Sequence, residues 1–375
     1  MDAQQIINAL LQLMRTRGAS DLFLTVGFPP AIKIDGAISP VSNQKLSAAD
    51  LRELTRVTMN EKQWLAFEQQ NESNFAISLS GIGRFRVNAF VQRGSYGLVI
   101  RSITQTIPNF EQLQLPPVLK EVAMAKRGLV IFVGGTGSGK STSLAAMIDY
   151  RNEHAQDHII TVEDPIEYLH EHKKSIITQR EIGIDTADWF SALKNTLRQA
   201  PNVILIGEVR DRETMEHALM FAETGHLCLT TLHANSTNQA IERIVNFFPK
   251  EAHHHLLADL STNIRAFVSQ RLVPHISGSG RVAAIEVLLH SPLIADLIGK
   301  GQVSEIKELM GRSRELGMQT FDQSLFDLAE KGLISLDEAL LNADSINDLR
   351  LRFKLEGKAS QNRDVSSGIA HLDII

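Results

Sequence analysis

The stretch Gly128-Leu-Val-Ile-Phe-Val-Gly-Gly-Thr-Gly-Ser-Gly-Lys-Ser-Thr142 decides how the chain folds. Its first part, residues 129–133, is a short apolar and β-branched run, which predicts a buried strand. Its second part matches the phosphate-loop pattern G-x-x-x-x-G-K-[ST] from Gly134 to Ser141. A helix is expected directly after the motif, to about residue 152. A strand before the loop and a helix after it are the context that this motif requires, so a flexible glycine loop is the weaker interpretation.

The loop predicts a site for the phosphates of a nucleotide. Glycines allow the backbone to wrap closely, so that successive N–H groups point at phosphate oxygens. The N-terminus of the following helix adds partial positive charge. Lys140 is expected to reach the β- and γ-phosphates, and Ser141 to place its hydroxyl on Mg²⁺. The candidate phosphate-binding residues are Gly134, Gly135, Thr136, Gly137, Ser138, Gly139, Lys140, Ser141 and Thr142.

Length and composition are those of an ordinary globular chain. With 375 residues it can form two domains, each with its own core. The net charge of −5 disfavours a dedicated nucleic-acid-binding protein, which usually carries a basic surplus. A single cysteine, Cys228, excludes disulfides within the chain and cysteine-rich zinc sites. No apolar stretch approaches about 18 residues and no signal-peptide pattern is present, so we expect a cytoplasmic protein with at most peripheral membrane contact.

The first hundred residues predict an α+β domain with an antiparallel sheet, because their strands come in hairpins and do not alternate with helices. Helices are expected before Gly18 and over residues 48–67, and strands over residues 20–26, 31–34, 75–79, 83–92 and 96–103. Arg84 and Arg86 fall on one face of a strand, and Arg101 lies on the following strand. These arginines are either solvated surface residues or contacts for a phosphate on a neighbouring subunit.

A second domain follows residues 104–117, whose prolines and lack of periodicity predict a linker. Beyond this linker, strands and helices alternate, which predicts a parallel α/β sheet. In an open sheet of this kind the ligand crevice lies outside the carboxyl ends of the strands. Side chains at those ends are therefore candidates for the site.

Glu163, Glu208 and His233 each follow an apolar run that predicts a strand: residues 158–162, 203–206 and 227–231. An acidic residue after such a strand, downstream of a phosphate loop, is the arrangement that holds Mg²⁺, so Glu208 is a metal candidate together with Ser141. We take Glu163, Glu208 and His233 as candidate catalytic residues. His226, which precedes its strand, is a candidate for nucleotide binding.

Ordinary structural roles remain open for each of these residues. Glu163 could cap a turn, Glu208 could be a solvated acid, and both histidines could be packing or loop residues. Their placement at strand ends beside a phosphate loop favours the functional interpretation. Three histidines at 253–255 are interpreted as solvated, because three consecutive helix positions cannot share one face to hold a metal.

The chain resembles the type II/type IV secretion ATPases at four ordered boxes. Residues 134–142 resemble their Walker A box, Ile160-Thr-Val-Glu-Asp-Pro-Ile-Glu167 their Asp box, Val203-Ile-Leu-Ile-Gly-Glu-Val-Arg-Asp211 their Walker B box and Gly225-His-Leu-Cys-Leu-Thr-Thr-Leu-His233 their His box. Within that superfamily the chain is most similar to the pilus retraction branch formed by PilT and PilU. Gly83-Arg-Phe-Arg-Val-Asn-Ala-Phe90 and Gly317-Met-Gln-Thr-Phe-Asp-Gln-Ser-Leu325 extend the resemblance, which covers roughly residues 1–350.

Two departures favour the PilU side of this branch. Residues 292–300 lack the arginines of the Ala-Ile-Arg-Asn-Leu-Ile-Arg-Glu-like stretch that PilT proteins carry. Ala200-Pro201-Asn202, before the Walker B box, lacks the acidic residues that PilT-like chains favour around the proline. Any role that depends on the missing arginines is therefore not expected here.

The resemblance implies a RecA-like P-loop ATPase domain preceded by a PAS-like α+β domain. The expected boundaries are 1–103 for the PAS-like domain, 104–117 for the linker, 118–290 for the ATPase domain, 291–356 for a helical C-terminal region and 357–375 for a disordered tail. Leu325, Leu328, Leu333, Leu336, Leu340 and Leu349 are expected to supply the apolar faces of the helical region.

The implied activity is Mg²⁺-dependent ATP hydrolysis by a homohexameric ring, coupled to retraction and disassembly of a type IV pilus in twitching motility. Glu163 would orient the attacking water, Glu208 would hold Mg²⁺ through water, and Arg86 and Arg101 would contact nucleotide. The implied partners are a PilT-type paralogue and a PilC-like platform protein of the inner membrane, with no nucleic acid. The implied place is the cytoplasm, peripheral to the inner membrane at the pilus base.

Three alternatives stay open at this level. A pilus or secretion assembly ATPase typically carries a four-cysteine zinc insertion, which a chain with only Cys228 cannot build. A RecA-like nucleic-acid translocase is disfavoured by the acidic balance. A nucleotide-gated accessory ring that supports a PilT-type motor is harder to dismiss, although all the catalytic groups are present.

Overall fold

The computed structural model describes residues 2–34, 36–103 and 106–357, and these residues form two compact units. The first unit comprises the chain up to Thr106 together with the segments Pro165–His170 and Arg180–Ala192, whose inclusion no sequence signal indicated. The second unit comprises the remaining residues. The expected tail at 357–375 lies, apart from Gly357, outside the described residues.

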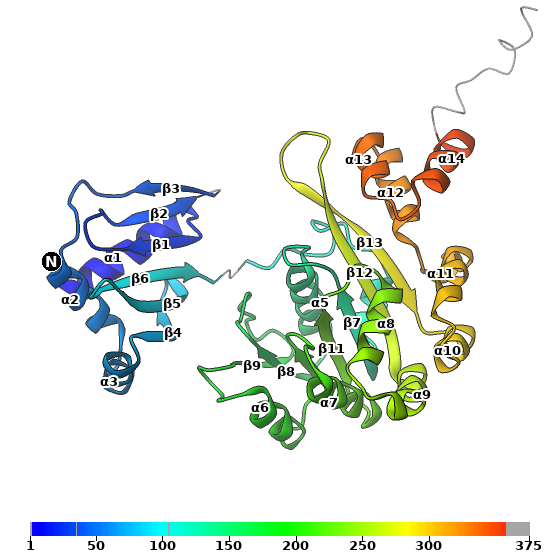
Figure 1. The fold of residues 1–375 in the computed structure, drawn as a ribbon, viewed down its shortest axis with the longest axis horizontal. Coiled ribbons are helices and arrows are strands. Elements are labelled where there is room, and N and C mark those ends of the chain that lie inside the picture. Colours follow the sequence, from blue (N-terminus) through cyan, green and yellow to red (C-terminus); the bar gives the residue numbers. More distant parts are fainter. Residues whose placement is uncertain (1, 35, 104–105, 358–375) are drawn as a thin grey trace, which may run out of the picture. The chain divides into compact units, whose positions relative to one another are not determined.

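The first unit is built on a six-stranded antiparallel sheet with the strand order β3-β2-β1-β6-β5-β4 (Figure 1). Along β5 the side chains of Phe85, Val87 and Ala89 are fully buried, and they alternate with half-exposed residues. This period of two is what a sheet with one covered face requires. The strands are β1 (Asp21–Leu24), β2 (Ala31–Ile34), β3 (Ala37–Pro40), β4 (Glu72–Leu79), β5 (Gly83–Gln92) and β6 (Ser95–Ser102).

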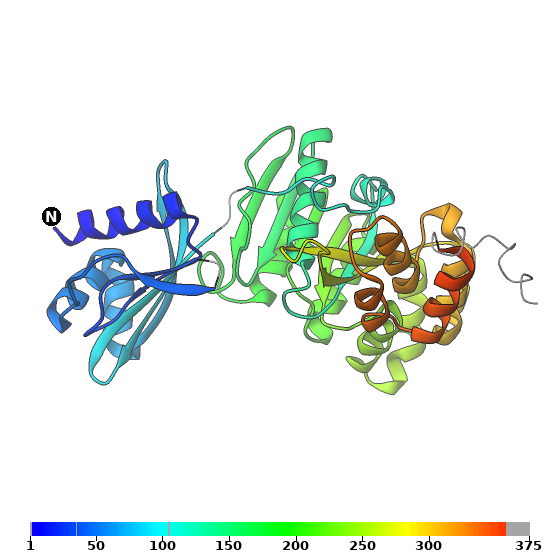
Figure 2. The same ribbon diagram turned by 90° about the horizontal axis from the view of Figure 1, so that it is seen from above.

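Three helices cover one face of this sheet: α1 (Ala3–Arg17), α2 (Ala48–Thr58) and α3 (Glu61–Gln70) (Figure 2). The single helix expected over 48–67 is wrong. The chain leaves the helical conformation at Met59, and the Asn60 side chain accepts from the Gln63 N–H to start α3. A capping box of this kind typically contributes about 1 kcal/mol, so the polar cap outweighs the continuous apolar pattern.

The second unit contains a seven-stranded sheet with the order β13-β12-β7-β11-β10-β8-β9. The expectation of a parallel sheet holds from β12 to β8, whereas β13 runs antiparallel to β12. Val130 and Phe132 of β7 pack against Leu144 and Met147 of α5 in the main core. The strands are β7 (Gly128–Val133), β8 (His158–Glu163), β9 (Ile176–Glu181), β10 (Val203–Ile206), β11 (Leu227–Leu232), β12 (Ile264–Pro274) and β13 (Arg281–Leu289). The last two residues of β9, Arg180 and Glu181, are counted with the first unit.

The helix expected directly after the phosphate loop is present and is α5. Both α5 and α7 contact the strands β7 and β11. Residues 188–199 predict one helix, whereas the structure has α6 from Trp189 and then a short 3-10 turn, Leu197–Gln199. The helices are α4 (Val118–Ala123), α5 (Lys140–His154), α6 (Trp189–Thr196), α7 (Arg212–Glu223), α8 (Thr237–Asn246), α9 (His253–Asn263), α10 (Pro292–Gly299), α11 (Val303–Arg312), α12 (Phe321–Glu330), α13 (Leu336–Leu341) and α14 (Ile346–Glu356).

The last helices pack onto the β12–β13 hairpin through a separate apolar cluster (Figure 1). Val273 and Ala284 of the hairpin meet Phe321 and other apolar side chains of the C-terminal helices. Among the leucines expected to form this core, Leu325, Leu328 and Leu349 are buried, and Leu333 and Leu340 are partly buried. Leu336 is 49% exposed, because it opens α13 at the surface. In the described part of the chain, no helix is both long and apolar enough to cross a bilayer.

A buried carboxylate on β13 makes the stability of the second unit depend on pH. Glu286 is 2% exposed, and burial raises its pKa even though the N–H of Thr237 donates to it. Asp344 also raises the pKa of Glu286, whereas Lys307 lowers it. Because the folded-state pKa is above the unfolded value, the stability contributed by Glu286 is present below the ordinary carboxyl pKa and is lost as pH rises through the folded value.

We therefore expect Glu286→Gln, which cannot ionise, to gain melting temperature relative to the unsubstituted protein as pH rises from about 4.5 to about 7.5. Thermal unfolding of both proteins across that range measures the difference. Glu315→Gln, at an exposed position, is the matched control and should leave the difference unchanged with pH. A constant difference for Glu286→Gln would show that this carboxyl has an ordinary pKa.

Candidate functional site

The phosphate loop connects the buried strand β7 to α5, as the motif predicts. Gly137 and Gly139 have φ values of 75° and 87°, in the left-handed region that glycine adopts without strain. A Cβ atom added at Gly139 would also lie 2.7 Å from Nε2 of Gln270. Gly139 is the N-cap of α5 and has no side chain to accept from the first-turn N–H groups, so these donors can serve an anion.

Lys140 lies on the loop itself. Its side chain is buried, and Nζ donates to the carbonyl oxygens of Gly134 at 2.8 Å and Gly135 at 2.9 Å. Ser143, one turn into α5, donates to Oε1 of Gln270 at 2.8 Å. Gln270 therefore connects β12 to the phosphate loop and its helix. A cavity of about 440 Å³ opens beside the loop and is lined in part by Gly135 and His233.

Glu208 and His233 meet at the carboxyl ends of β10 and β11. His233 Nε2 lies 3.1 Å from Oε1 of Glu208. Arg210 holds the other oxygen, since its Nε donates to Oε2 of Glu208 at 2.9 Å, and Arg210 also lies 3.8 Å from Asp164. Burial lowers the pKa of His233, and the charge of Lys140 lowers it further, although Glu208 opposes both. The imidazole is therefore kept neutral more readily than usual, so its Nε2–H can donate to the carboxylate.

Glu163 is the last residue of β8, on the same edge of the sheet. Thr161 donates to its Oε1 at 2.6 Å, and Gln179 of β9 donates to the same oxygen at 3.2 Å. Strand β8 is the third strand from β7 in the sheet, a lateral distance of roughly 14 Å. Glu163 thus shares the edge with the phosphate loop but is farther from it than Glu208 is in strand order.

His226 lies at the other edge of the sheet. Its carbonyl accepts from the N–H of Gly128 at 3.0 Å, at the beginning of β7, whereas the phosphate loop follows the end of β7. Leu227 pairs with Gly128, and the six residues of β11 separate His226 from His233, roughly 20 Å along the strand. The structure does not bring His226 to the phosphate loop of its own chain, so we leave it out of the site proposed below.

The three arginines lie together on β5 and β6 of the first unit. Arg86 is directly opposite Arg101 across the strand pair, and Arg84 shares their face, as predicted from its spacing with Arg86. Like charges in this arrangement repel each other unless acids balance them. Within the first unit, Arg101 pairs with Asp21 at 2.8 Å, Arg86 lies 3.9 Å from Glu181, and Arg84 lies 3.9 Å from Asp185.

The oxygen donors at the site fit a magnesium ion. Mg²⁺ prefers hard oxygen ligands and keeps several waters, so a hydroxyl and one carboxylate next to substrate phosphates are a suitable set. Ser141 and Glu208 are of this kind, and Glu208 is 20% exposed at its side chain. Among the described residues there is no cluster of three or more His, Cys, Asp or Glu that could hold a metal without other ligands. That includes the histidines at 253–255.

Sequence reasoning missed Gln270, Arg210 and Thr231. In the sequence, Arg210 was noted only as part of the Walker B-like box. No local pattern indicated that its side chain donates a hydrogen bond to Glu208. Thr231 donates to the carbonyl of Gly207 at 2.7 Å and ties the ends of β10 and β11 together. Gln270 reaches Ser143 from 127 residues away in the chain. Such contacts depend on strand order, which no local pattern reveals.

Fold and strand-edge geometry together define a RecA-like P-loop ATPase domain preceded by a PAS-like α+β domain. The model of the type II/IV secretion system protein family matches residues 3–336, and the chain belongs to that family. It is 57% identical to the type IV pilus ATPase PilU of Pseudomonas aeruginosa over 363 residues, 96% of this chain and 95% of that protein.

Two further comparisons agree. Identity with the type IV pilus retractation ATPase PilT of the same organism is 43% over 333 residues, 89% of this chain and 96% of that protein. A crystal structure of the pilus retraction motor PilT with bound ADP superimposes with a TM-score of 0.85 at 40% identity, covering 94% of this chain and 99% of that one. The resemblance to PilT and PilU is thus confirmed, with the higher identity on the PilU side.

Proposed function

We propose that this protein is an ATP-hydrolysing ring motor that powers retraction of a type IV pilus. The observation that carries the proposal is the strand-edge site itself, with a phosphate loop beside the Glu208–His233 pair. The structural relative that binds ADP is a pilus retraction motor, and the relatives at 57% and 43% identity are pilus ATPases. These relatives support an adenine nucleotide as the ligand and pilus retraction as the process.

In this proposal the residues of the site divide the work of phosphoryl transfer. Lys140 and the loop N–H groups stabilise phosphate charge, while Ser141 and Glu208 hold Mg²⁺, which supplies further charge stabilisation when bound. His233 keeps Glu208 oriented through its hydrogen bond. Glu163 orients the attacking water and accepts its proton, with its own orientation set by Thr161 and Gln179.

We further propose a homohexamer acting in the cytoplasm at the inner-membrane base of the pilus, with a PilC-like platform protein and a PilT-type paralogue as partners. The proposed domain boundaries remain 1–103, 104–117, 118–290, 291–356 and 357–375. Deleting the gene, then scoring surface piliation and the frequency of pilus retraction, tests the role. We expect more surface pili and fewer retractions, and an unchanged phenotype would contradict it.

Arg86 and Arg101 are proposed to contact nucleotide across a subunit boundary of the ring, together with Arg84. Their clustering on one face, with acids as resting partners, supports this role because an arginine can exchange a carboxylate for a phosphate at little cost. We expect Arg86→Ala and Arg101→Ala each to lower hydrolysis by roughly 10³-fold if the residue stabilises transition-state charge.

Mixed rings test whether the contact acts in trans. A Lys140→Ala subunit has an intact arginine, and an Arg86→Ala subunit has an intact phosphate loop, so a mixture should regain activity that neither protein has alone. Arg93→Ala, on an exposed turn of the same unit, is the control and should behave like the unsubstituted protein. Normal hydrolysis by rings of the single arginine variants would rule the contact out.

A further inference from the structure

Neighbouring residues of β12 face two different parts of the second unit. Gln270 contacts Ser143 beside the phosphate loop. Side chains of successive strand residues point to opposite faces, so Arg271 is directed away from that contact. Arg271 is half-buried, and its guanidinium stacks on the ring of Phe321 in α12 with 4.0 Å to the ring centre. A single strand therefore connects the nucleotide site to the C-terminal helices.

The guanidinium of Arg271 joins two segments that are far apart in the chain. Nη2 donates to the carbonyl of Asn235 at 3.1 Å, two residues after His233. Nη1 donates to the carbonyl of Asn342 at 2.8 Å, and Nη2 also donates to Oδ1 of Asp344 at 2.7 Å. The fixed fork of a guanidinium suits such a three-way contact, which a lysine cannot reproduce.

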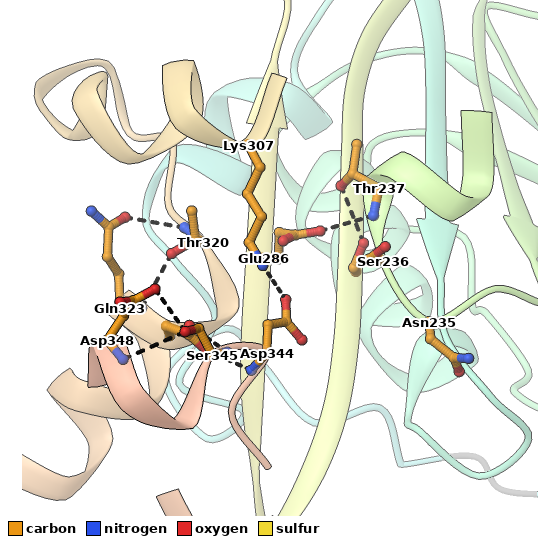
Figure 3. Close-up of polar contacts among 12 residues, drawn as sticks. Asn235, Ser236, Thr237, Glu286, Lys307, Thr320, Gln323, Asp344, Ser345 and Asp348 are labelled. Atoms are coloured by element: carbon orange, nitrogen blue, oxygen red, sulfur yellow. Dashed lines mark hydrogen bonds and ion pairs between the residues drawn. The ribbon is translucent and has the colours of Figure 1, made fainter. Parts of the chain in front are cut away.

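The segment after His233 is held from its other end by β13. The N–H of Thr237, the first residue of α8, donates to Oε1 of Glu286 at 2.8 Å (Figure 3). The hydroxyl of Thr237 also shares a hydrogen bond of 3.2 Å with the hydroxyl of Ser269 in β12. Residues 234–237 are thus fixed at Asn235 by Arg271 and at Thr237 by Glu286. Because His233 directly precedes this segment, its position against Glu208 depends on both contacts.

On the C-terminal side the contact point is Asp344, in the turn between α13 and α14. Lys307 of α11 donates to Oδ2 of Asp344 at 2.7 Å (Figure 3). Burial alone would raise the pKa of Asp344, but Lys307 and Arg271 outweigh it and hold this pKa below its usual value. Asp322 of α12 accepts from the backbone N–H groups of Asp344 and Ser345. This turn is therefore rigidly attached to α11, α12 and Arg271.

We propose that Arg271 is a positioning residue that couples nucleotide occupancy at the phosphate loop to the C-terminal helices α13 and α14. It acts through Asn235 on His233 and Glu208, and through Asn342 and Asp344 on the helices. The inference rests on the proposed function, because it takes the strand-edge site to bind nucleotide. Its consequence is that the C-terminal helices respond to the nucleotide state of their own subunit through one side chain.

Hydrogen–deuterium exchange with and without ADP tests this coupling without requiring turnover. In the full-length protein we expect ADP to slow exchange in residues 134–142, in 234–246 and in 336–356. In Arg271→Gln the slowing at 134–142 should persist, whereas the slowing at 336–356 should disappear. Arg271→Lys keeps the positive charge but not the forked guanidinium, so it should lose most of the ADP response at 336–356. This variant replaces Arg271→Gln in the test if the glutamine variant does not fold.

Steady-state kinetics provide a second readout. We expect Arg271→Gln to lower kcat roughly tenfold by displacing His233, while the dissociation constant for ADP changes by less than about threefold. Arg281→Gln, at the exposed end of the same hairpin, is the matched control and should retain both the exchange response and kcat.

The outcomes separate this inference from the proposed function. No slowing at 134–142 in the unsubstituted protein would contradict nucleotide binding at the loop, and with it both proposals. Slowing at 134–142 together with an equal response at 336–356 in the unsubstituted protein, Arg271→Gln and Arg271→Lys would overturn the role of Arg271 alone. Equal losses of kcat and ADP affinity would likewise overturn it, since they would indicate general damage to the loop.

Discussion

Lys140→Ala is expected to abolish ATP hydrolysis, with a fall in kcat of at least about 10²–10³-fold. The ammonium group of Lys140 is held on the phosphate loop by the carbonyls of Gly134 and Gly135, beside the proposed phosphate site. Removing it leaves phosphate charge uncompensated in the transition state. Phosphate release by the purified variant, at saturating Mg-ATP, measures the effect.

Lys62→Ala is the matched control for this experiment, because Lys62 is exposed on α3 and far from the loop in sequence. It should hydrolyse ATP at the normal rate. If Lys140→Ala retained activity close to that of the control, the assignment of residues 134–142 as the phosphate site would be wrong.

Glu163→Gln and Glu208→Gln are expected to differ in the step that they impair. In Glu163→Gln the amide oxygen can still accept hydrogen bonds from Thr161 and Gln179, but the proposed base is lost. Hydrolysis should therefore fall roughly 10²–10⁴-fold, while Mg-ATP should still bind. Glu208→Gln removes the charge that we propose to hold Mg²⁺ and the anionic partner of Arg210 and His233, so the Mg²⁺-dependent part of ATP binding should weaken as well.

Nucleotide titrations of both variants, with Mg²⁺ and with a chelator, separate the two roles. Glu216→Gln is a suitable control, since Glu216 is an exposed acid on α7 that pairs with Arg212. Normal hydrolysis by Glu163→Gln combined with undiminished Mg-ATP binding by Glu208→Gln would mean that the two roles are reversed or wrong.

The phosphate loop and the strand ends of the site could be predicted from sequence, because each is specified by consecutive residues. Glycines, lysine and serine between 134 and 142 specify a loop and a helix start, and apolar runs before Glu163 and Glu208 specify strand ends. The α+β and α/β assignments followed from whether strands came in hairpins or alternated with helices. The resemblance to secretion ATPases rested on the same short segments.

What sequence could not supply is the order of the strands and the contacts that depend on it. His226 precedes β11 and His233 follows it, and the parallel pairing of β11 with β7 places only His233 on the phosphate-loop side. The break at Met59 and Asn60 was missed because the apolar pattern continues through it while the polar cap decides. The link from Arg271 to Asn235 and Asp344 joins residues 36 and 73 positions away, beyond any local signal.

The most direct test of the central claim is pilus retraction in cells whose only copy of this gene carries Lys140→Ala. Labelled pili are followed individually, and retraction frequency is compared with cells carrying the unsubstituted gene or none. If hydrolysis at this phosphate loop drives retraction, Lys140→Ala cells should match the deletion. Retraction at the normal frequency in Lys140→Ala cells would contradict the account and favour an accessory ring that supports another motor.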